Sequence, residues 1–466
     1  MQNKHILIVL KFGSFFGYIE SLIKELTLNN KVTLCVQEDN KIDSANYYID
    51  SSDGSLIVEN LRLNKKIILA KKTDNLNIIY GVKRRDSWAK ILRIIRETLN
   101  YISYLIRGDH NTFFQNQSKY VPRKILIFLR IIKFKFLLKI IFKLLRLIHY
   151  VIPSSKTIKK FIYDLGPDLV LVVGANWPTR KEDLSSEIDF IKASNQLKKP
   201  SVAHVISWDN LIARGLYHYN PSVMFVWNKT HYEEAVNVQK MPKDSLKIIG
   251  APFMDKWFEN LNVPPKKVFF ESIGLDANKP LITYLGSAKN ISTSENEVVE
   301  ILHDKLSKSG IQLIVRPHGA NNNQFNSIKN KIKIVPLNGE LPDTVESKEL
   351  MVATLKYSDL TVGINTTAMI DSVILNTPCI SIVKKEYSFN QSDTPHFKKV
   401  QKEGIFIEAK NENEILRKII EFNNNDNSIL FKKMNNFVKE FCRPFGIDTS
   451  AAKRALLEIY ELTINK

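Results

Sequence analysis

The sequence predicts an α/β protein built from two successive sheets of parallel strands. Short apolar runs such as residues 5–10 (HILIVL) and 168–173 (DLVLVV) are typical of strands buried on both faces. Most of these runs are followed by a polar loop and then by a helical pattern, and this alternation favours a parallel sheet. The series pauses near 253–265 and restarts at residue 281. The chain length of 466 residues is ample for two such domains.

The first series is interrupted by a stretch with helical spacing, at about residues 86–160, which we interpret as an insertion into the first sheet domain. The strands expected in the first series are 5–10, 32–36, 168–173, 201–206, 223–227 and 246–249, and its helices are 19–28, 188–197 and 230–238.

The second series has the same rhythm. Its expected strands are 281–285, 312–315, 333–335, 360–363 and 379–383, and its helices are 295–309, 348–356, 367–375, 413–422 and 451–462. The predicted organisation is therefore an N-terminal Rossmann-like domain (1–252), a linker (253–279), a C-terminal Rossmann-like domain (280–446) and a C-terminal helix (447–466) able to cross back.

Composition excludes several classes of protein. Hydrophobic residues make up 44% of the chain, which excludes wholesale disorder. The three cysteines are too few and too scattered for a disulfide framework or a CxxC metal site, and this favours a reducing, cytoplasmic environment. The apolar run 4–10 is too short for an export signal, and no stretch of about 18 uncharged apolar residues predicts a spanning helix.

The net charge of +19 is concentrated in one segment. Residues 110–163 hold twelve Lys and Arg and no Asp or Glu. On a helix, Lys135, Lys139, Lys143 and Arg146 fall within roughly 80° of one another. An apolar helix with such a stripe suits the boundary between headgroups and acyl chains, so we expect peripheral association with the anionic inner face of the membrane. A buried linker helix that exposes one Lys-rich side is an alternative. Nucleic-acid binding is disfavoured because aromatic platforms are sparse and no such motif is present.

Two loops that follow predicted strands carry candidate ligands for an anion. Arg316 in the sequence RPH offers a planar fork for phosphate oxygens. In GINTTAMID, the residues Asn365, Thr366 and Thr367 can cap the next helix, whose N-terminal amides favour a diphosphate. The ordinary alternative is that the threonines are only caps and that His318 is only a loop residue.

These two motifs resemble the donor-binding domain of GT-B glycosyltransferases. The pattern is closest to the CDP-glycerol glycerophosphotransferases and to bacterial surface-polysaccharide transferases, in which RPHP precedes a strand and a DYSSxxFD segment. It is similar, more distantly, to the non-hydrolysing UDP-N-acetylglucosamine 2-epimerases. The resemblance covers about residues 280–446 and implies a GT-B fold, with two Rossmann-like domains facing a cleft. The segments SWDNLIARG, VWNKTHYEEA and IIGAPFMDKW resemble surface-carbohydrate proteins.

The resemblance implies roles for individual residues of the second domain. It carries contacts with the donor diphosphate onto His318, Thr366 and Thr367, and it matches Asp371 to the acidic residue on the following helix. Ser287, after the strand 281–285, stands at the usual place of a second phosphate contact. This chain departs from the pattern at three places: Gly319 replaces the second Pro, Asn365 replaces Asp-Tyr, and Thr replaces Ser.

The first domain holds the candidate residues for the acceptor. Asp209 follows a strand, in the sequence SWDN, and is a candidate general base for an acceptor hydroxyl. An Asx turn formed by Asp209 and Asn210 is the alternative. Arg214 lies nearby in the sequence. A GT-B first loop normally faces the acceptor, so Lys11 and Ser14 are expected to meet a lipid-diphosphate head.

These observations predict a transferase that moves a sugar or a polyol phosphate from a nucleotide donor (a nucleotide-sugar or a CDP-polyol) to a surface-polymer or lipid-linked acceptor. Arg316, His318 and the helix that starts near Thr366 would stabilise the departing phosphate charge. No spacing of metal ligands occurs in the sequence, so we expect metal-independent chemistry without a cofactor. A 2-epimerase and a non-catalytic sugar-nucleotide-binding protein at the membrane remain alternatives. We expect no nucleic-acid partner.

Overall fold

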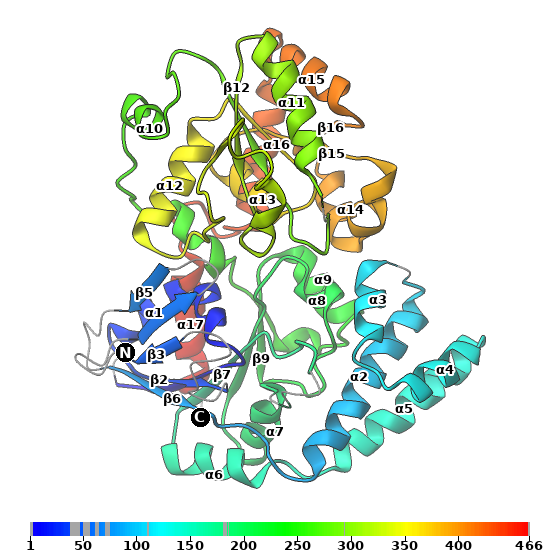
Figure 1. The fold of residues 1–466 in the computed structure, drawn as a ribbon. Coiled ribbons are helices and arrows are strands. Elements are labelled where there is room, and N and C mark those ends of the chain that lie inside the picture. Colours follow the sequence, from blue (N-terminus) through cyan, green and yellow to red (C-terminus); the bar gives the residue numbers. More distant parts are fainter. Residues whose placement is uncertain are drawn as a thin grey trace. The chain divides into compact units, whose positions relative to one another are not determined.

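The computed structural model describes residues 3–37, 75–109, 111–179, 184, 186–292 and 294–464, together with the backbone of three short strands between 47 and 69. The described residues form two compact units. The first contains residues up to Val58, from Ile68 to Phe253 and again from Phe441 onward, and the second contains residues 59–67 and 254–440. Figure 1 shows a strand-and-helix body for each unit.

The first unit is built on a sheet of seven parallel strands in the order β10-β9-β8-β7-β1-β2-β6. These strands are β1 (His5–Leu10), β2 (Lys31–Val36), β6 (Leu76–Tyr80), β7 (Leu169–Val173), β8 (Ser201–His204), β9 (Val223–Val226) and β10 (Leu246–Ile248). All five residues of β7 and the last five of β1 are buried. These are the runs without alternation that predicted a doubly covered parallel sheet.

The helices of the first unit come from both ends of the chain. They are α1 (Glu20–Thr27), α7 (Ile188–Gln196), α8 (Asn210–Ala213), α9 (Lys229–Asn237) and α17 (Ala451–Ile464). The C-terminal α17 packs against α1, as a helix that crosses back would. A small separate sheet has the order β3 (Tyr47–Ile49), β4 (Leu56–Asn60) and β5 (Lys65–Leu69).

The predicted helical insertion is present in the first unit. It comprises α2 (Trp88–Arg107), α3 (Thr112–Ser118), α4 (Arg123–Ile131), α5 (Lys135–Val151) and α6 (Lys156–Leu165). Tyr101 and Ile102 of α2 pack with Leu129 of α4 and Leu138 of α5 in one apolar cluster. In Figure 1, α4 and α5 lie side by side and project from the rest of the unit. None of the helices in the described residues is both long and apolar enough to cross a bilayer.

A buried ion pair fixes this insertion to the sheet domain. The guanidinium of Arg96 on α2 donates to both carboxylate oxygens of Asp189 on α7, at 2.6 and 3.2 Å. Its Nε also donates to Nε2 of His149 on α5, at 2.9 Å. Burial and the charge of Arg96 hold the pKa of His149 far below its usual range, so the ring stays neutral and accepts this hydrogen bond. Three helices from distant parts of the sequence are thus joined by one guanidinium.

The second unit is built on a sheet of six parallel strands in the order β13-β12-β11-β14-β15-β16. They are β11 (Leu281–Leu285), β12 (Gln312–Arg316), β13 (Lys333–Ile334), β14 (Leu360–Gly363), β15 (Cys379–Ile382) and β16 (Phe406–Ala409). Its helices are α10 (Lys266–Ser272), α11 (Asn296–Lys308), α12 (Val345–Lys356), α13 (Thr367–Ile374), α14 (Pro395–Lys402), α15 (Glu412–Asn424) and α16 (Ser428–Phe441).

The strand residues of the second sheet alternate between two apolar layers. Ile282 and Tyr284 of β11 pack with α11 and α15 on one face. Leu281 packs on the other face with Phe269 and Phe270 of α10 and with α12. The segment 253–279, expected as a linker, therefore holds a helix that belongs to the core of the second unit. The predicted α/β class with two Rossmann-like sheets and a helical insertion is confirmed.

Candidate functional site

The predicted donor residues lie at one edge of the second sheet. The chain proceeds from β11 to β12 and β13 on one side and then returns to β14 on the other, so the strand order reverses between β11 and β14. In open α/β sheets, ligands bind beyond the carboxyl ends of the strands at this point. Ser287 follows β11, Arg316 and His318 lie at the end of β12, and Asn365–Thr367 follow β14. Three neighbouring strands thus bring these residues to a common edge.

Two buried polar atoms at this edge have no hydrogen-bond partner: the hydroxyl of Ser287 and the Nη1 of Arg316. Ser287 is fully buried and Arg316 is 6% exposed. A buried donor without a partner costs about 1–3 kcal/mol, and such groups are rare in folded proteins. Both would be satisfied by an anionic ligand, since each can donate to a phosphate oxygen.

Arg316 interacts with two acidic residues of its own unit. Its Nη2 donates to the carbonyl of Glu340 at 3.0 Å. Burial lowers the pKa of Arg316 to about 10, and the charges of Asp371 and Glu340 act against this shift, so the guanidinium is positive at neutral pH. Asp371 is itself buried and accepts from the indole of Trp257 at 2.8 Å, and burial raises its pKa to about 6. Asp371 therefore acts on Arg316 through its charge and accepts a hydrogen bond from Trp257 in this structure.

The ring of His318 has a defined hydrogen-bonding pattern. Its Nδ1 accepts from the backbone N–H of Ala320 at 3.1 Å. Burial lowers the pKa of His318, so the neutral ring is favoured, and it then carries its proton on Nε2. The residue can therefore offer one N–H donor to a phosphate oxygen without carrying a charge.

The N-terminus of α13 offers a second group of donors. Thr366 is the N-cap residue, yet its side chain makes no capping hydrogen bond. Thr366 and Thr367 are both half-buried. The first backbone N–H groups of a helix and its positive dipole end favour an anion. Asn365 is committed elsewhere, since its Nδ2 donates to the carbonyl of Asn390 at 2.8 Å.

A residue that the sequence analysis did not single out, Glu295, holds the loop that carries Ser287. Its Oε1 accepts from the backbone N–H of Ser287 at 3.0 Å, and its Oε2 accepts from the hydroxyl of Tyr284 at 2.7 Å. The amide of Asn321 closes the same loop by donating to the carbonyls of Ser287 and Ser292. The available signal was an acidic residue at the first position of the predicted helix 295–309.

The burial of Glu295 predicts a pH dependence of stability. Burial raises its pKa from 4.5 to about 7. Because the unfolded chain ionises first, the free energy of unfolding of the second unit falls as pH rises from 4.5 to about 7, by about 3 kcal/mol in total. Glu295→Gln will flatten this part of the profile, measured by denaturant unfolding across that range. Glu297→Gln, at an exposed position of the same helix, will keep the slope of the parent. An unchanged slope in Glu295→Gln would contradict the assignment.

The backbone beside His318 leaves no room for a side chain on Gly339. A Cβ there would lie 3.1 Å from the Cα of Gly319 and 3.2 Å from its N, and Gly339 has φ +64°. We expect Gly339→Ala to lower the free energy of unfolding by about 1–3 kcal/mol beyond the cost of the φ angle. Gly310→Ala is the matched control, because Gly310 has φ +72° and no atom within 4 Å. Equal losses in the two variants would exclude crowding at Gly319.

The equivalent point of the first sheet lies beyond the carboxyl ends of the neighbouring strands β1 and β7, between which the strand order reverses. Lys11 follows β1, is 1% exposed and donates from Nζ to the carbonyl of Pro178 at 3.1 Å. The structure therefore uses this amine to tie the loop after β1 to the loop after β7. Ser14, in contrast, is exposed. Of these two predicted acceptor contacts, only Ser14 is accessible in this conformation.

Asp209 lies in a cluster of polar and aromatic side chains beyond β8. Its Oδ1 accepts from the hydroxyl of Ser207 at 2.6 Å, and its Oδ2 lies 3.8 Å from Nη2 of Arg214. The guanidinium of Arg214 is stacked over the ring of Trp177, 4.1 Å from the ring centroid. Trp177 was not predicted as a site residue, although an aromatic residue in a loop after a strand is a usable signal. The cluster combines a carboxylate, a guanidinium and an aromatic ring at one edge.

Helix α2 of the insertion fixes the loops around this cluster. Glu97 accepts from the backbone N–H of Thr179 at 2.7 Å. The hydroxyl of Tyr104 donates to the carbonyls of Ile212 and Arg214. The loops after β7 and β8 are therefore braced by the helix that also packs against α4 and α5.

The four cations of the predicted stripe all lie on α5, and all are exposed: Lys135, Lys139, Lys143 and Arg146.

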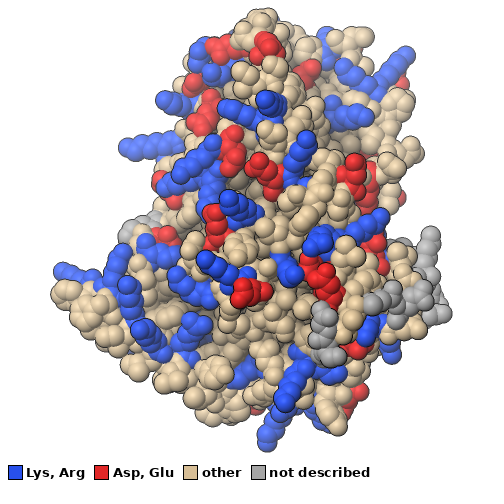
Figure 2. All heavy atoms as spheres, turned by 180° about the vertical axis from the view of Figure 1, so that it is seen from behind, with Lys and Arg blue, Asp and Glu red and all other residues tan. Residues whose placement is uncertain are grey.

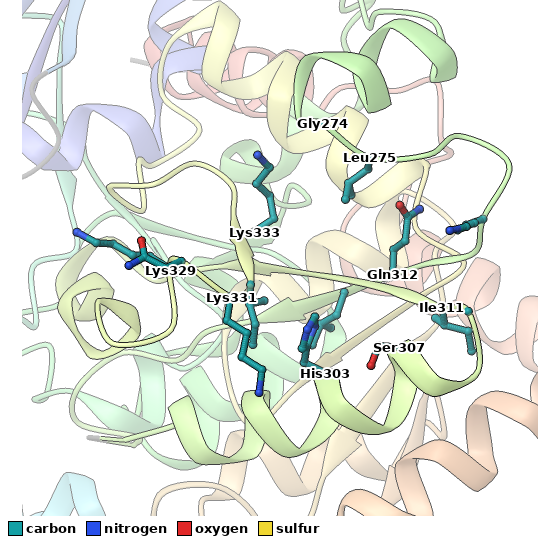
Figure 3. A pocket seen from close by; sticks show the side chains of 14 residues that line it. Gly274, Leu275, His303, Ser307, Ile311, Gln312, Lys329, Lys331 and Lys333 are labelled. Carbon is teal, nitrogen blue, oxygen red and sulfur yellow. The ribbon is translucent and has the colours of Figure 1, made fainter.

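Among the described residues, no group of three or more His, Cys, Asp and Glu is arranged to hold a metal ion. A separate pocket of about 410 Å³ lies at the opposite edge of the second sheet, where β12 and β13 begin. Figure 3 shows Lys329, Lys331 and Lys333 beside Gln312 and His303 around this pocket. Lys331 is paired with Asp304 at 2.8 Å. None of the predicted donor residues lines it.

Comparisons with known proteins identify the fold. No family model matches the sequence, and no curated protein matches it. Among solved structures, UDP-GlcNAc 2-epimerase from Neisseria meningitidis bound to UDP-GlcNAc is 12% identical, with a TM-score of 0.51 and coverage of 99% of this chain and 100% of the other. UDP-GlcNAc 2-epimerase from Methanocaldococcus jannaschii is 14% identical, with a TM-score of 0.50 and coverage of 99% of both chains. A glycosyltransferase from Rickettsia africae is 12% identical, with a TM-score of 0.50 and full coverage of both chains.

At these identities the likeness concerns the fold alone. It extends over the whole chain, and it joins a glycosyltransferase with 2-epimerases, which are the two groups that the RPH and GINTTAMID motifs resemble. The chain therefore has the two-domain GT-B fold that these glycosyltransferase and 2-epimerase structures share.

Proposed function

We propose that this protein is a metal-independent transferase that moves a sugar or a polyol phosphate from a nucleotide donor to a cell-surface polysaccharide or lipid-linked acceptor. The observation that carries the proposal is the pair of unpartnered donors, Ser287 Oγ and Arg316 Nη1, at the point where the second sheet reverses its strand order. A buried cation and a buried hydroxyl at this position suit the diphosphate of a nucleotide.

In this proposal the second unit binds the donor and stabilises the leaving group. The bond between the transferred group and the nucleotide breaks, and the nucleotide departs with the electron pair and an additional negative charge on its phosphate. Arg316, the Nε2–H of His318 and the first amides of α13 would stabilise that charge. Thr366 and Thr367 contribute hydroxyl donors from the same helix end.

The first unit supplies the acceptor side of the proposal. The acceptor hydroxyl forms the new bond to the transferred group and gives its proton to the carboxylate of Asp209. Nη2 of Arg214 lies 3.8 Å from that carboxylate. Ser14 and the ring of Trp177 are available to position the acceptor.

A sugar-nucleotide 2-epimerase is the second candidate, because two epimerases are among the solved structures with this fold. A non-catalytic sugar-nucleotide-binding protein is the third. Incubation with a nucleotide-sugar or CDP-polyol and membranes from a polymer-forming bacterium separates the three, with the products resolved by chromatography. Transfer to the lipid or polymer fraction supports the proposal. A free epimer, or binding without any product, would replace it by the second or third candidate.

We also propose that the protein works in the cytoplasm, associated peripherally with the inner face of the cell membrane. The cationic segment 110–163 supports this location.

A further inference from the structure

Helices α4 and α5 together form what we call the α4–α5 arm. The surface of the arm that does not pack against its own unit is unusually apolar for a region exposed to water. On α4, Phe128 is 58% exposed and Ile131 is 71% exposed. On α5, Ile140, Leu144 and Leu147 are each at least half exposed. Monomeric soluble proteins rarely expose a contiguous apolar patch of this kind unless it is an interaction site.

The exposed apolar side chains of α5 form one stripe. At about 100° per residue, Ile140, Leu144, Leu147 and Val151 fall within roughly 60° of one another. Leu138 and His149, which are buried, face α2 on a different side of the same helix. The helix thus has an inner side that packs against its own unit and a separate outer side that is apolar and remains exposed in the part of the chain that the structure describes.

The charges around this stripe all have one sign. Residues 110–163 contain twelve Lys and Arg and no acidic residue. Figure 2 shows the arm, at the lower left, in blue and tan. On α4 the exposed cations Arg123, Lys124 and Arg130 are interleaved with the apolar residues. On α5 the stripe of Lys135, Lys139, Lys143 and Arg146 lies about 115° around the helix from the apolar stripe. Their long stems allow the charged ends to reach headgroups beside an inserted helix.

We infer that the outer surface of α4 and α5 inserts into the headgroup region of an anionic lipid bilayer, with its apolar stripe toward the acyl chains and its cations among the headgroups. The positive charge of this surface is complementary to the negative charge of an anionic bilayer, and this favours lipid as the partner. A second copy of the chain would bring two surfaces of the same positive sign together, which is unfavourable. The inference deepens the membrane association proposed above by naming the surface and the class of lipid, and it does not depend on the transfer reaction.

Co-sedimentation of the full chain with lipid vesicles tests the inference. The parent will bind vesicles of phosphatidylcholine and phosphatidylglycerol, and salt will weaken the binding. The triple variant Ile140→Ser, Leu144→Ser, Leu147→Ser will lose more than tenfold in binding. The quadruple variant Lys135→Gln, Lys139→Gln, Lys143→Gln, Arg146→Gln will lose its preference for the anionic lipid. Because all seven positions are exposed, both variants will keep the melting temperature of the parent.

Matched controls lie on the second unit. Val268→Ser, Ile420→Ser and Ile429→Ser remove three exposed apolar side chains, and Lys329→Gln, Lys432→Gln, Lys433→Gln and Lys439→Gln remove four exposed cations. Both control variants will bind vesicles like the parent. The inference is overturned if the parent remains in the supernatant, or if the apolar control loses as much binding as the arm variant. A dimer in size-exclusion chromatography that the arm triple variant dissociates, with no vesicle binding, would assign the surface to a second copy instead.

Discussion

Removal of Arg316 or His318 will weaken the binding of nucleoside diphosphates by about ten- to a hundredfold, because each residue offers a hydrogen bond to a charged phosphate. Arg316→Ala, His318→Ala and Thr366→Val are the variants, and isothermal titration calorimetry with UDP, CDP and GDP is the measurement. Arg316 is buried beside the charge of Asp371 and donates to the carbonyl of Glu340, so Arg316→Ala will also lower the melting temperature, and its affinity is compared with that of the parent at a temperature at which both proteins are folded.

The matched control for this experiment is Arg417→Ala. Arg417 belongs to the same unit, but it is exposed and pairs only with Glu414 and Glu421 on its own helix among the described residues. Its removal will leave nucleotide affinity at the level of the parent. If the Arg316, His318 and Thr366 variants also bind as tightly as the parent, the nucleotide does not bind at the carboxyl ends of β11, β12 and β14. The proposal would then rest on the fold alone.

Asp209→Asn will lower turnover by about a hundredfold or more while leaving nucleotide affinity unchanged. The amide keeps the shape of the carboxylate but cannot take the proton of an acceptor hydroxyl. The measurement combines the rate of group transfer at saturating donor with calorimetric titration of the nucleotide. Asp244→Asn, at an exposed position of the first unit, is the control and will keep full turnover. Full turnover by Asp209→Asn would show that another group accepts the proton.

The strands that form the two sheet edges were predictable because their signal is local. Apart from His5 and Thr283, the runs 5–10 and 281–285 consist of apolar and aromatic residues, as is typical of a parallel sheet covered on both faces. The polar residues that follow such runs are then placed by topology, because the carboxyl ends of parallel strands meet at one edge. This reasoning sufficed to bring Ser287, Arg316 and Thr366 together from three distant segments.

The interactions that hold the loops at the carboxyl ends of the strands were not predictable from the sequence, because they depend on tertiary packing. Glu295 acts through Ser287 and Tyr284, and nothing in its local sequence specifies these partners. The sequence predicts an exposed loop position for Lys11, yet its amine is buried and donates to the carbonyl of Pro178, which lies far along the chain. Helix α10 was not predicted because two prolines and two lysines precede its apolar residues, so the sequence shows no clear helical periodicity there.

For the α4–α5 arm, too, one feature could be predicted from the sequence and another could not. Helical periodicity correctly grouped the four cations of α5 on one face, since the angle per residue is fixed. Which of the remaining apolar sides packs against α2 is decided by Tyr101, Ile102 and Leu129, and these come from other helices. The exposed apolar stripe became visible only once that packing was known.

The most direct test of the donor assignment is a crystal structure of the protein with a bound nucleoside diphosphate. We predict that the diphosphate lies beyond the carboxyl ends of β11, β12 and β14, with phosphate oxygens accepting hydrogen bonds from Nη1 of Arg316, the hydroxyl of Ser287 and the first amides of α13. A diphosphate bound instead at the edge of the first sheet near Lys11, or in the lysine-lined pocket where β12 and β13 begin, would contradict the account.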